Sequence, residues 1–540
     1  MKLFVKLICN FNRNIWGVLF FMGTILASCT EEPAPIAVSL VTLDSTSMTL
    51  VEGETQKLTA TVTPSNAENK VVIWTSSDSS VASVNDGLVT AIKVGKATIT
   101  VKTDDGGKTA TCEVTVNAKV YPVESVTLDK TSYEMAERDE FTLTATVKPD
   151  NATNKKLTWS SSNTSVATVS NGKVMALKPG NATITVKTDD GGKTATCEVI
   201  IRADISALGT ANCYIVKEAG FYKFTPSKGN SNESVGTITS VDVLWETFGT
   251  NQTPNVGDLI TNVKFADGLI CFDTPKIFKE GNAVIAAKDA NGKILWSWHI
   301  WLTDQPEGQV YYNNAGTMMD RNLGATSATP GDVGALGLLY QWGRKDPFLG
   351  SSSISSNAIA KSTIYWPSAV SSITSWGTIA FATANPTTFI RYNSNNYDWY
   401  YTTSSSTDNT RWTTSESSKS IYDPCPAGWR VPDGGSNGVW AKAIGSLDDF
   451  QCTYNSTNGG MNFSGKFGNA STIWYPASGF RSSNGGSLAD VGKVGLYWSA
   501  SPIDYCAFAL YFDFDGGFFQ SFNDLSRAGG QSVRCLQESK

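Results

Sequence analysis

An internal repeat constrains the fold of this chain more than any other feature. The eighteen-residue string ATITVKTDDGGKTATCEV occupies residues 97–114 and recurs unchanged at residues 182–199, 85 positions later. At the same offset, WTSSDSSVASV from Trp74 aligns with WSSSNTSVATV from Trp159. The chain therefore contains two consecutive copies of one folded unit.

Each copy has the pattern of a strand-rich domain. Leu58, Ala60 and Val62 alternate with polar residues, which places them on one face of a strand. Asn85-Asp86-Gly87 and Ser170-Asn171-Gly172 are signals for tight turns. About seven short strands within about 80 residues predict an immunoglobulin-like sandwich.

The run WTSSDSSVASVNDGLVTAIKVGKATITV resembles the bacterial group 2 Ig-like domain (BIG2), over residues 37–117 and again over 118–202. Each copy has a single cysteine on its last strand, Cys112 or Cys197, which we expect to be a small buried apolar residue. The copies contain no histidine to activate their many hydroxyl groups. We expect them to form a non-catalytic stalk.

The N-terminus has the features of a secretory signal. Basic residues precede an apolar run from Ile15 to Leu26, and small residues follow. Leu26-Ala27-Ser28-Cys29 resembles a bacterial lipobox, which implies a signal peptide over residues 1–28, lipidation of Cys29 and a tether over residues 29–36. The acidic pair after Cys29 resembles the export signal of Bacteroidetes surface lipoproteins. The predicted location is the outer membrane, exposed at the cell surface; its periplasmic face is the alternative.

The composition and charge of the chain limit the kinds of molecule that it is expected to bind. Removal of Lys2, Lys6 and Arg13 with the signal changes the formal net charge from −6 to −9. An acidic chain does not suit nucleic acid or an anionic membrane surface, so the lipid is the expected membrane contact. At 540 residues several domains are expected, and 17% charged residues with abundant Gly, Ser and Thr indicate a mainly β fold.

Residues 203–310 are predicted to form a separate β-rich domain. A hairpin is expected from residues 283–287 to residues 293–301, through the turn Asp289-Ala290-Asn291-Gly292. Alternation puts Trp296 and Trp298 on one face, where an aromatic stripe is more often core than sugar site. His299, the only histidine, is expected to be structural.

Five motifs in the last 230 residues carry a second resemblance; in order they are MDRNLGA, LYQWGR, DPCPAGWRVP, YWSA and GQSVRC. They resemble the Fibrobacter succinogenes major paralogous domain (FISUMP), over residues 311–540. That family is similar to C-type-lectin-like folds, which implies an α+β module. The likeness also implies a Cys425–Cys535 bridge, closing a loop worth roughly 4–5 kcal/mol in the chain-entropy model. Further disulfide candidates are Cys213 with Cys271, and Cys452 with Cys506.

No catalytic triad, metalloprotease, phosphate-loop or dinucleotide motif occurs, and we expect neither a metal nor a cofactor. The most suggestive binding stretch surrounds a Ser/Thr-rich loop. Its aromatic rings suit stacking on sugars, and its charged groups suit directional hydrogen bonds. The candidate ligand-binding residues are Tyr397, Asp398, Trp399, Tyr400, Arg411 and Trp412. The alternative is an insertion whose aromatic residues pack onto the module.

The sequence thus predicts tandem Ig-like sandwiches, a β-rich domain and a C-terminal α+β module. We expect a surface lipoprotein that presents this module for adhesion, by binding a glycan or a partner surface protein. One alternative is a carbohydrate-active or modifying enzyme that uses carboxylates of residues 311–540; two acidic residues converging in one pocket would favour it. The other is a structural fimbrial or surface-layer component.

Overall fold

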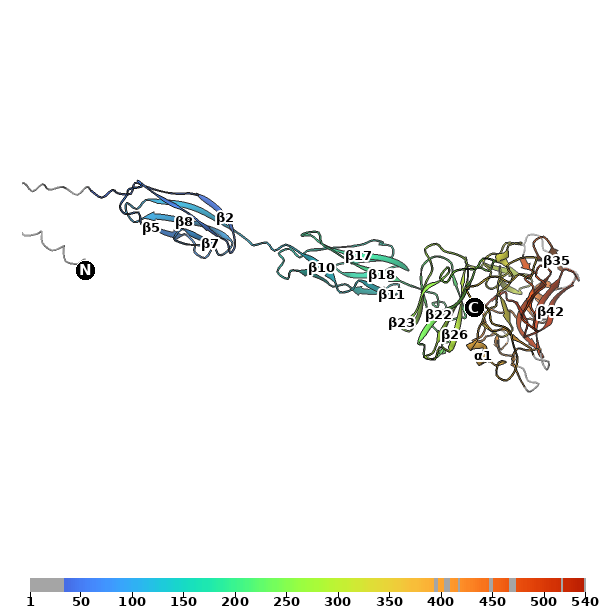
Figure 1. Cartoon of the computed structure of the whole chain (residues 1–540). Coiled ribbons are helices and arrows are strands. Elements are labelled where there is room, and N and C mark those ends of the chain that lie inside the picture. The colour runs from blue at the N-terminus through green and yellow to red at the C-terminus, as the bar shows by residue number, and fades with distance from the viewer. Residues whose placement is uncertain are drawn as a thin grey trace, which may run out of the picture. The chain divides into compact units, whose positions relative to one another are not determined.

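The computed structural model describes residues 34–392, 397–402, 408–415, 418–445, 450–465, 473–515 and 518–538. The chain divides into two compact units between Tyr121 and Pro122. Both units are built mainly of strands, which confirms the predicted fold class (Figure 1). Within the described ranges no helix is long and apolar enough to cross a membrane.

The first unit is a sandwich with one sheet of order β2-β9-β8-β5, a second of order β3-β7-β6, and the pair β1-β4. Ile99, Cys112 and Val114 from the first sheet are fully buried in its core. The predicted turn joins β6 to β7, where Asp86 and Gly87 both have positive φ. The strands are β1 (Leu40–Leu43), β2 (Ser47–Val51), β3 (Thr55–Lys57), β4 (Ala60–Thr63), β5 (Val72–Ser76), β6 (Ala82–Asn85), β7 (Leu88–Ala91), β8 (Gly95–Thr103) and β9 (Thr109–Asn117).

The second unit begins with a sandwich of the same topology, with sheets β11-β18-β17-β14 and β12-β16-β15 and the pair β10-β13. Cys197 is fully buried and free, as is Cys112 in the first sandwich, which confirms the predicted role of both. The strands are β10 (Ser125–Leu128), β11 (Ser132–Met135), β12 (Glu140–Thr142), β13 (Ala145–Lys148), β14 (Leu157–Ser161), β15 (Ala167–Ser170), β16 (Lys173–Ala176), β17 (Gly180–Thr188) and β18 (Thr194–Ile201).

A buried arginine joins this sandwich to the next sheets. Arg202 directly follows β18 and is 4% exposed. Its guanidinium group donates to Glu134 of β11 at 3.2 Å through Nε, and also donates to the carboxylate of Asp273. Lys264 donates to the same Glu134 at 2.6 Å. The joint is therefore held by two carboxylates and two cations.

Two four-stranded sheets follow, with orders β19-β21-β24-β23 and β20-β26-β25-β22. The predicted hairpin is confirmed as β25 and β26. Trp296 and Trp298 of β26 pack in a core shared with the first of these sheets, whereas Trp301 packs in a core shared with residues beyond 310. The strands are β19 (Ala203–Asp204), β20 (Cys213–Val216), β21 (Phe221–Phe224), β22 (Ser240–Thr247), β23 (Thr261–Ala266), β24 (Leu269–Asp273), β25 (Gly281–Lys288) and β26 (Ile294–Leu302).

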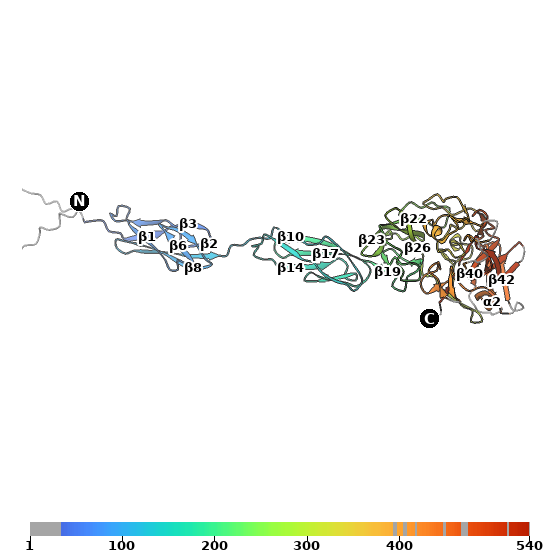
Figure 2. The same ribbon diagram turned by 90° about the horizontal axis from the view of Figure 1, so that it is seen from below.

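The last part is centred on a seven-stranded sheet of order β39-β38-β43-β40-β41-β42, in which β29 also pairs with β43. Figure 2 labels β40 and β42 of this sheet. Two short α-helices and one 3₁₀-helix accompany it in the described residues. The elements are β27 (Gly308–Tyr311), β28 (Gly316–Met319), η1 (Val333–Ala335), β29 (Leu339–Gln341), β30 (Val370–Ser371), α1 (Ile379–Ala384), β31 (Ile390–Arg391), β32 (Thr413–Ser415), β33 (Ser418–Lys419), β34 (Trp429–Arg430), α2 (Val439–Ile444), β35 (Phe450–Asn455), β36 (Gly460–Gly465), β37 (Ile473–Pro476), β38 (Phe480–Arg481), β39 (Leu488–Ala489), β40 (Val494–Ile503), β41 (Cys506–Asp513), β42 (Phe518–Ser526), β43 (Gly530–Ser532) and β44 (Leu536–Gln537).

Candidate functional site

The candidate ligand-binding residues of the sequence divide into a buried and a solvent-facing set. Trp399 is 1% exposed and donates its indole N–H to the carbonyl of Trp342 at 2.6 Å. Trp412 is fully buried and donates to the carbonyl of Arg344 at 3.1 Å. Because both rings are enclosed, no sugar can stack on them in this conformation. The prediction is corrected at these two positions.

Asp398 and Arg411 also belong to the interior. Both are 1% exposed, and Arg411 Nη1 donates to Asp398 Oδ1 at 3.0 Å. Arg527 Nη1 donates to Asp398 Oδ2 at 3.3 Å, so two guanidinium groups share one carboxylate. Burial lowers the pKa of Arg527 to about 10, and Arg411 and Arg527 lie 4.9 and 4.4 Å from the Trp342 ring. These charges hold the loop in place rather than meet a ligand.

The two tyrosines of the candidate set remain closer to solvent. Tyr400 is half-buried, and its ring lies 5.4 Å from the Arg411 guanidinium. Tyr397 is 58% exposed, and its carbonyl accepts hydrogen bonds from Ser526 Oγ at 2.6 Å and from the amide of Ala528 at 3.2 Å. Tyr397 therefore lies against the end of β42, next to the pocket described below.

One of the predicted disulfides forms. Cys425 and Cys535 are bonded, with their Cα atoms 6.1 Å apart. The other two proposed pairs do not form, because all four of their cysteines are free. Cys213 on β20 packs in the core that contains the disulfide, whereas Cys271 lies on β24 of the other sheet. The free cysteines of the two rejected pairs are Cys213, Cys271, Cys452 and Cys506.

Two predictions concern the N-terminal 33 residues. The signal peptide and the lipidation site Cys29 lie outside the described residues.

The remaining prediction on a single residue concerns His299. Its ring Nε2 lies 2.8 Å from Asn282 Oδ1, and burial lowers its pKa to about 3. This buried neutral imidazole is structural, as expected.

A buried Ser–Lys–Asp cluster resembles catalytic chemistry but lacks space for a substrate. Lys345 Nζ donates to Ser297 Oγ at 2.5 Å and to Asp346 Oδ1 at 2.6 Å, and burial lowers the pKa of Lys345. The adjoining cavity measures only about 10 Å³ and holds at most one water molecule. The cluster therefore ties β26 to the segment after β29.

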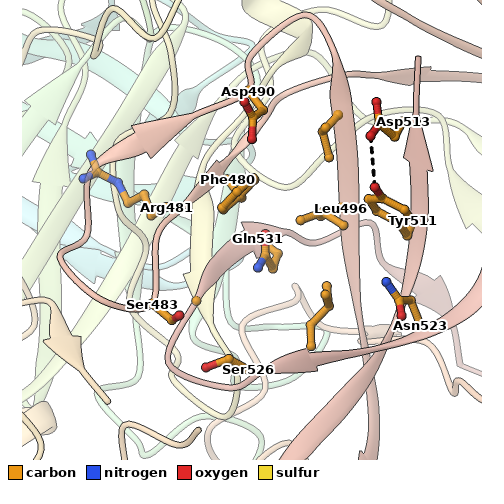
Figure 3. Close-up of a pocket in the computed structure, with 13 residues that line it drawn as sticks. Phe480, Arg481, Ser483, Asp490, Leu496, Tyr511, Asp513, Asn523, Ser526 and Gln531 are labelled. Atoms are coloured by element: carbon orange, nitrogen blue, oxygen red, sulfur yellow. Dashed lines mark hydrogen bonds between the residues drawn. The ribbon is translucent and has the colours of Figure 1, made fainter. Parts of the chain in front are cut away.

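A larger pocket opens on the seven-stranded sheet (Figure 3). Its volume is about 400 Å³, within the range of small-molecule sites. Apolar side chains from three strands and Phe480 of β38 contribute to its walls, and polar side chains converge between them. The lining residues are Phe480, Arg481, Ser483, Asp490, Val494, Leu496, Tyr511, Asp513, Asn523, Leu525, Ser526, Gly529 and Gln531.

Gln531 has an unused hydrogen-bonding group at this pocket. Its side chain is 3% exposed, and its Oε1 atom has no hydrogen-bond partner among the described residues. Figure 3 shows it surrounded by the other labelled lining residues. A buried acceptor without a partner is costly, so an incoming donor would gain a bond here.

Two of the other polar side chains of the pocket, Asp490 and Asp513, are carboxylates that only accept hydrogen bonds. Arg481 is 9% exposed and already donates to the carbonyls of Leu349 and Gly486, at 2.9 and 2.7 Å, and burial lowers its pKa to about 10. Asp490 is exposed at the rim. Tyr511 donates to Asp513 Oδ2 at 3.2 Å; burial, and then the Asp513 carboxylate, raise the pKa of Tyr511. A ligand rich in hydroxyl or ammonium donors fits this arrangement.

Sequence reasoning missed this pocket because its residues come from five strands and from the segments that connect them. The strings Asp513–Gly517 and Gly530–Cys535 were visible in the sequence, yet neither marks a pocket by itself. Of the first string, Asp513 is the last residue of β41, and Phe514 and Asp515 follow it. No group of three or more His, Cys, Asp or Glu side chains that could hold a metal occurs in the described part of the chain.

A family model described as the bacterial Ig-like domain (group 2) matches residues 37–114 and 122–199. An Ig-like virion protein of Serratia phage KSP90 is 38% identical over 174 residues, which cover 32% of this chain and 67% of the phage protein. An uncharacterised protein of Clostridium acetobutylicum is 35% identical over 195 residues, which cover 35% of this chain and only 20% of that protein.

Among solved structures, domains 4 and 5 of the S-layer protein SbsC match with 26% identity, covering 31% of this chain and all of that one. The TM-score of 0.17 is too low for this likeness to support an argument about function.

Proposed function

Because residues 37–114 and 122–199 belong to the bacterial Ig-like domain (group 2) family, we propose that the chain is a surface protein in which these domains form a non-catalytic stalk. The stalk would present the body formed by residues 203–538 for adhesion. A lipid on Cys29 would anchor it to the outer membrane, at the cell surface. Metabolic labelling with an alkyne-tagged fatty acid tests the anchor: Cys29→Ala should abolish labelling.

We further propose that the pocket on the seven-stranded sheet binds a saccharide. The unpartnered Oε1 of buried Gln531 carries this proposal, because it requires a donor that a sugar hydroxyl supplies. Asp490, Asp513 and Asn523 add directional partners around it, and Phe480 adds an aromatic wall. Apolar walls with a few polar groups are typical of small-molecule sites.

A glycan array tests this proposal with the protein from residue 30 onward. Asp490→Asn is the variant of choice, because Asp490 is exposed and has positive φ, which asparagine tolerates. Asp515→Asn is the control, an exposed carboxylate two residues after β41 that pairs with Lys493 at 2.7 Å and does not line the pocket. We expect Asp490→Asn alone to lose binding. Equal binding by both variants, or binding by a truncation ending at Arg202, would refute the pocket as the site.

One observation favours a second function. Asp490 and Asp513 converge on the same pocket, as a carboxylate-based carbohydrate-active enzyme would require. Incubating the protein with each glycan that it binds, and analysing the products by mass spectrometry, separates the two functions. Cleavage that Asp513→Asn abolishes would establish the enzyme, whereas unchanged glycans favour recognition.

A further inference from the structure

An exposed phenylalanine extends the sheet face that carries the pocket. Phe518 is the first residue of β42 and is 59% exposed. In the antiparallel pairing of β41 with β42 it stands directly opposite Asp513. Directly opposed residues project to the same side of a sheet, and Asp513 lines the pocket. Phe518 therefore lies beside the pocket, on its side of the sheet.

A β-bulge produces this placement. Ala509 pairs with Asn523 and Tyr511 with Gln520, so β42 contains one extra residue between these two pairs. Without the bulge, Phe518 and Asn523 would face opposite sides, because they are five positions apart and side chains alternate along a strand. With it, Phe518 shares the side of Asn523, which lines the pocket. Bulges are frequent next to binding sites, where they redirect a side chain.

We propose that Phe518 is the stacking surface of a second subsite, so that the ligand is an oligosaccharide of at least two units. This inference rests on the proposed saccharide pocket. The end unit would enter the pocket, where the acceptors Asp490, Asp513 and Gln531 Oε1 meet its hydroxyl groups. The next ring would leave past Asp513 and lie on Phe518, whose face is open to solvent. Aromatic rings pack well on the apolar face of a sugar ring.

The chain supplies a matched control on the same strand. Phe522 is 45% exposed and precedes Asn523, so it projects to the side away from the pocket. Its ring contacts Phe508, with the centroids 6.1 Å apart. Phe518→Ala and Phe522→Ala therefore remove the same group, at similar exposure, from opposite faces of β42.

Isothermal titration calorimetry of the protein from residue 30 onward tests the subsite. The probes are glucose with cellobiose and maltose, and N-acetylglucosamine with N,N′-diacetylchitobiose. We expect at least one disaccharide to bind about 3- to 10-fold more tightly than its monosaccharide. Phe518→Ala should abolish this gain and leave monosaccharide binding unchanged, while Phe522→Ala should keep the gain.

The outcomes separate the two proposals. The second subsite is refuted if the wild-type protein binds a disaccharide no more tightly than its monosaccharide. It is also refuted if Phe518→Ala still binds the disaccharide more tightly. In both cases the proposed saccharide pocket stands. If the wild-type protein binds none of the probes, or if Asp490→Asn leaves monosaccharide binding unchanged, both proposals fall.

Discussion

Replacing Asp398 with asparagine tests whether the aromatic loop is structural or binds a ligand. The Asp398 carboxylate is 1% exposed and accepts hydrogen bonds from Arg411 and Arg527, at 3.0 and 3.3 Å. The Asp398→Asn change leaves both buried guanidinium groups without the negative charge that they share. Removing one partner of a buried ion pair costs about 3–5 kcal/mol. In a body of more than 250 residues, each kcal/mol lowers the melting temperature by about 2 °C, which predicts a decrease of about 6–10 °C.

Differential scanning calorimetry of the full protein measures this shift. Tyr397→Ala is the control, because Tyr397 is adjacent and 58% exposed; we expect its effect to stay within about 0.5 kcal/mol. The reasoning is refuted if Asp398→Asn melts within about 1 °C of the wild type. If Asp398→Asn melted like the wild type but lost glycan binding, Asp398 would contact the ligand, as the sequence predicted.

Three further changes have defined outcomes. Arg202→Ala leaves Asp273 and Glu134 without their shared cation; we expect a loss of about 3 kcal/mol, seen in calorimetry as a lower melting temperature of the second sandwich. Removing the Cys425–Cys535 bridge by a double alanine substitution should cost roughly 4–5 kcal/mol in denaturant unfolding, because it opens a 110-residue loop. Burial raises the pKa of Asp423 to about 6, so the folded state binds an extra proton between pH 6 and 3.8, and Asp423 favours folding as the pH falls. Burial lowers the pKa of His299 to about 3, so the unfolded state binds the extra proton at this residue, and His299 favours unfolding as the pH falls below 6.5. In the wild type the two residues oppose each other, whereas in Asp423→Asn only the effect of His299 remains. The free energy of unfolding of Asp423→Asn should therefore fall faster on acidification than that of the wild type, by about 1.4 kcal/mol per pH unit between pH 6 and 4.

The sequence predicted those parts of the fold that depend on local patterns. The two sandwiches follow from strand alternation and turn residues such as Asp86-Gly87, which lie within one copy of the repeat. The hairpin of β25 and β26 follows from alternation on either side of a short turn. The strands of the hairpin are neighbours in sequence, and every strand pairing of a sandwich lies within one copy of the repeat, even where two strands as distant as β2 and β9 pair.

The candidate site was less predictable because its determinants are distant in sequence. The loop that contains Trp399 has the composition of a sugar site, yet Arg527, 129 residues beyond Asp398, completes the ion cluster that buries it. The side on which Phe518 projects depends on a bulge in β42, and a shift of one residue reverses every side chain beyond it. No local pattern reveals such a shift.

The sheet β20-β26-β25-β22 determines how much of the chain is needed to hold the pocket. Trp298 on one face of β26 packs with residues of 203–310, whereas Trp301 on the other face packs with Trp342 and the disulfide-bonded Cys425. A protein that ended at residue 310 would expose Trp301 and the rest of this face to water. Residue 310 therefore marks a boundary between two sets of sequence motifs, but residues on both sides of it pack into one hydrophobic core. The body that the stalk presents includes both sides.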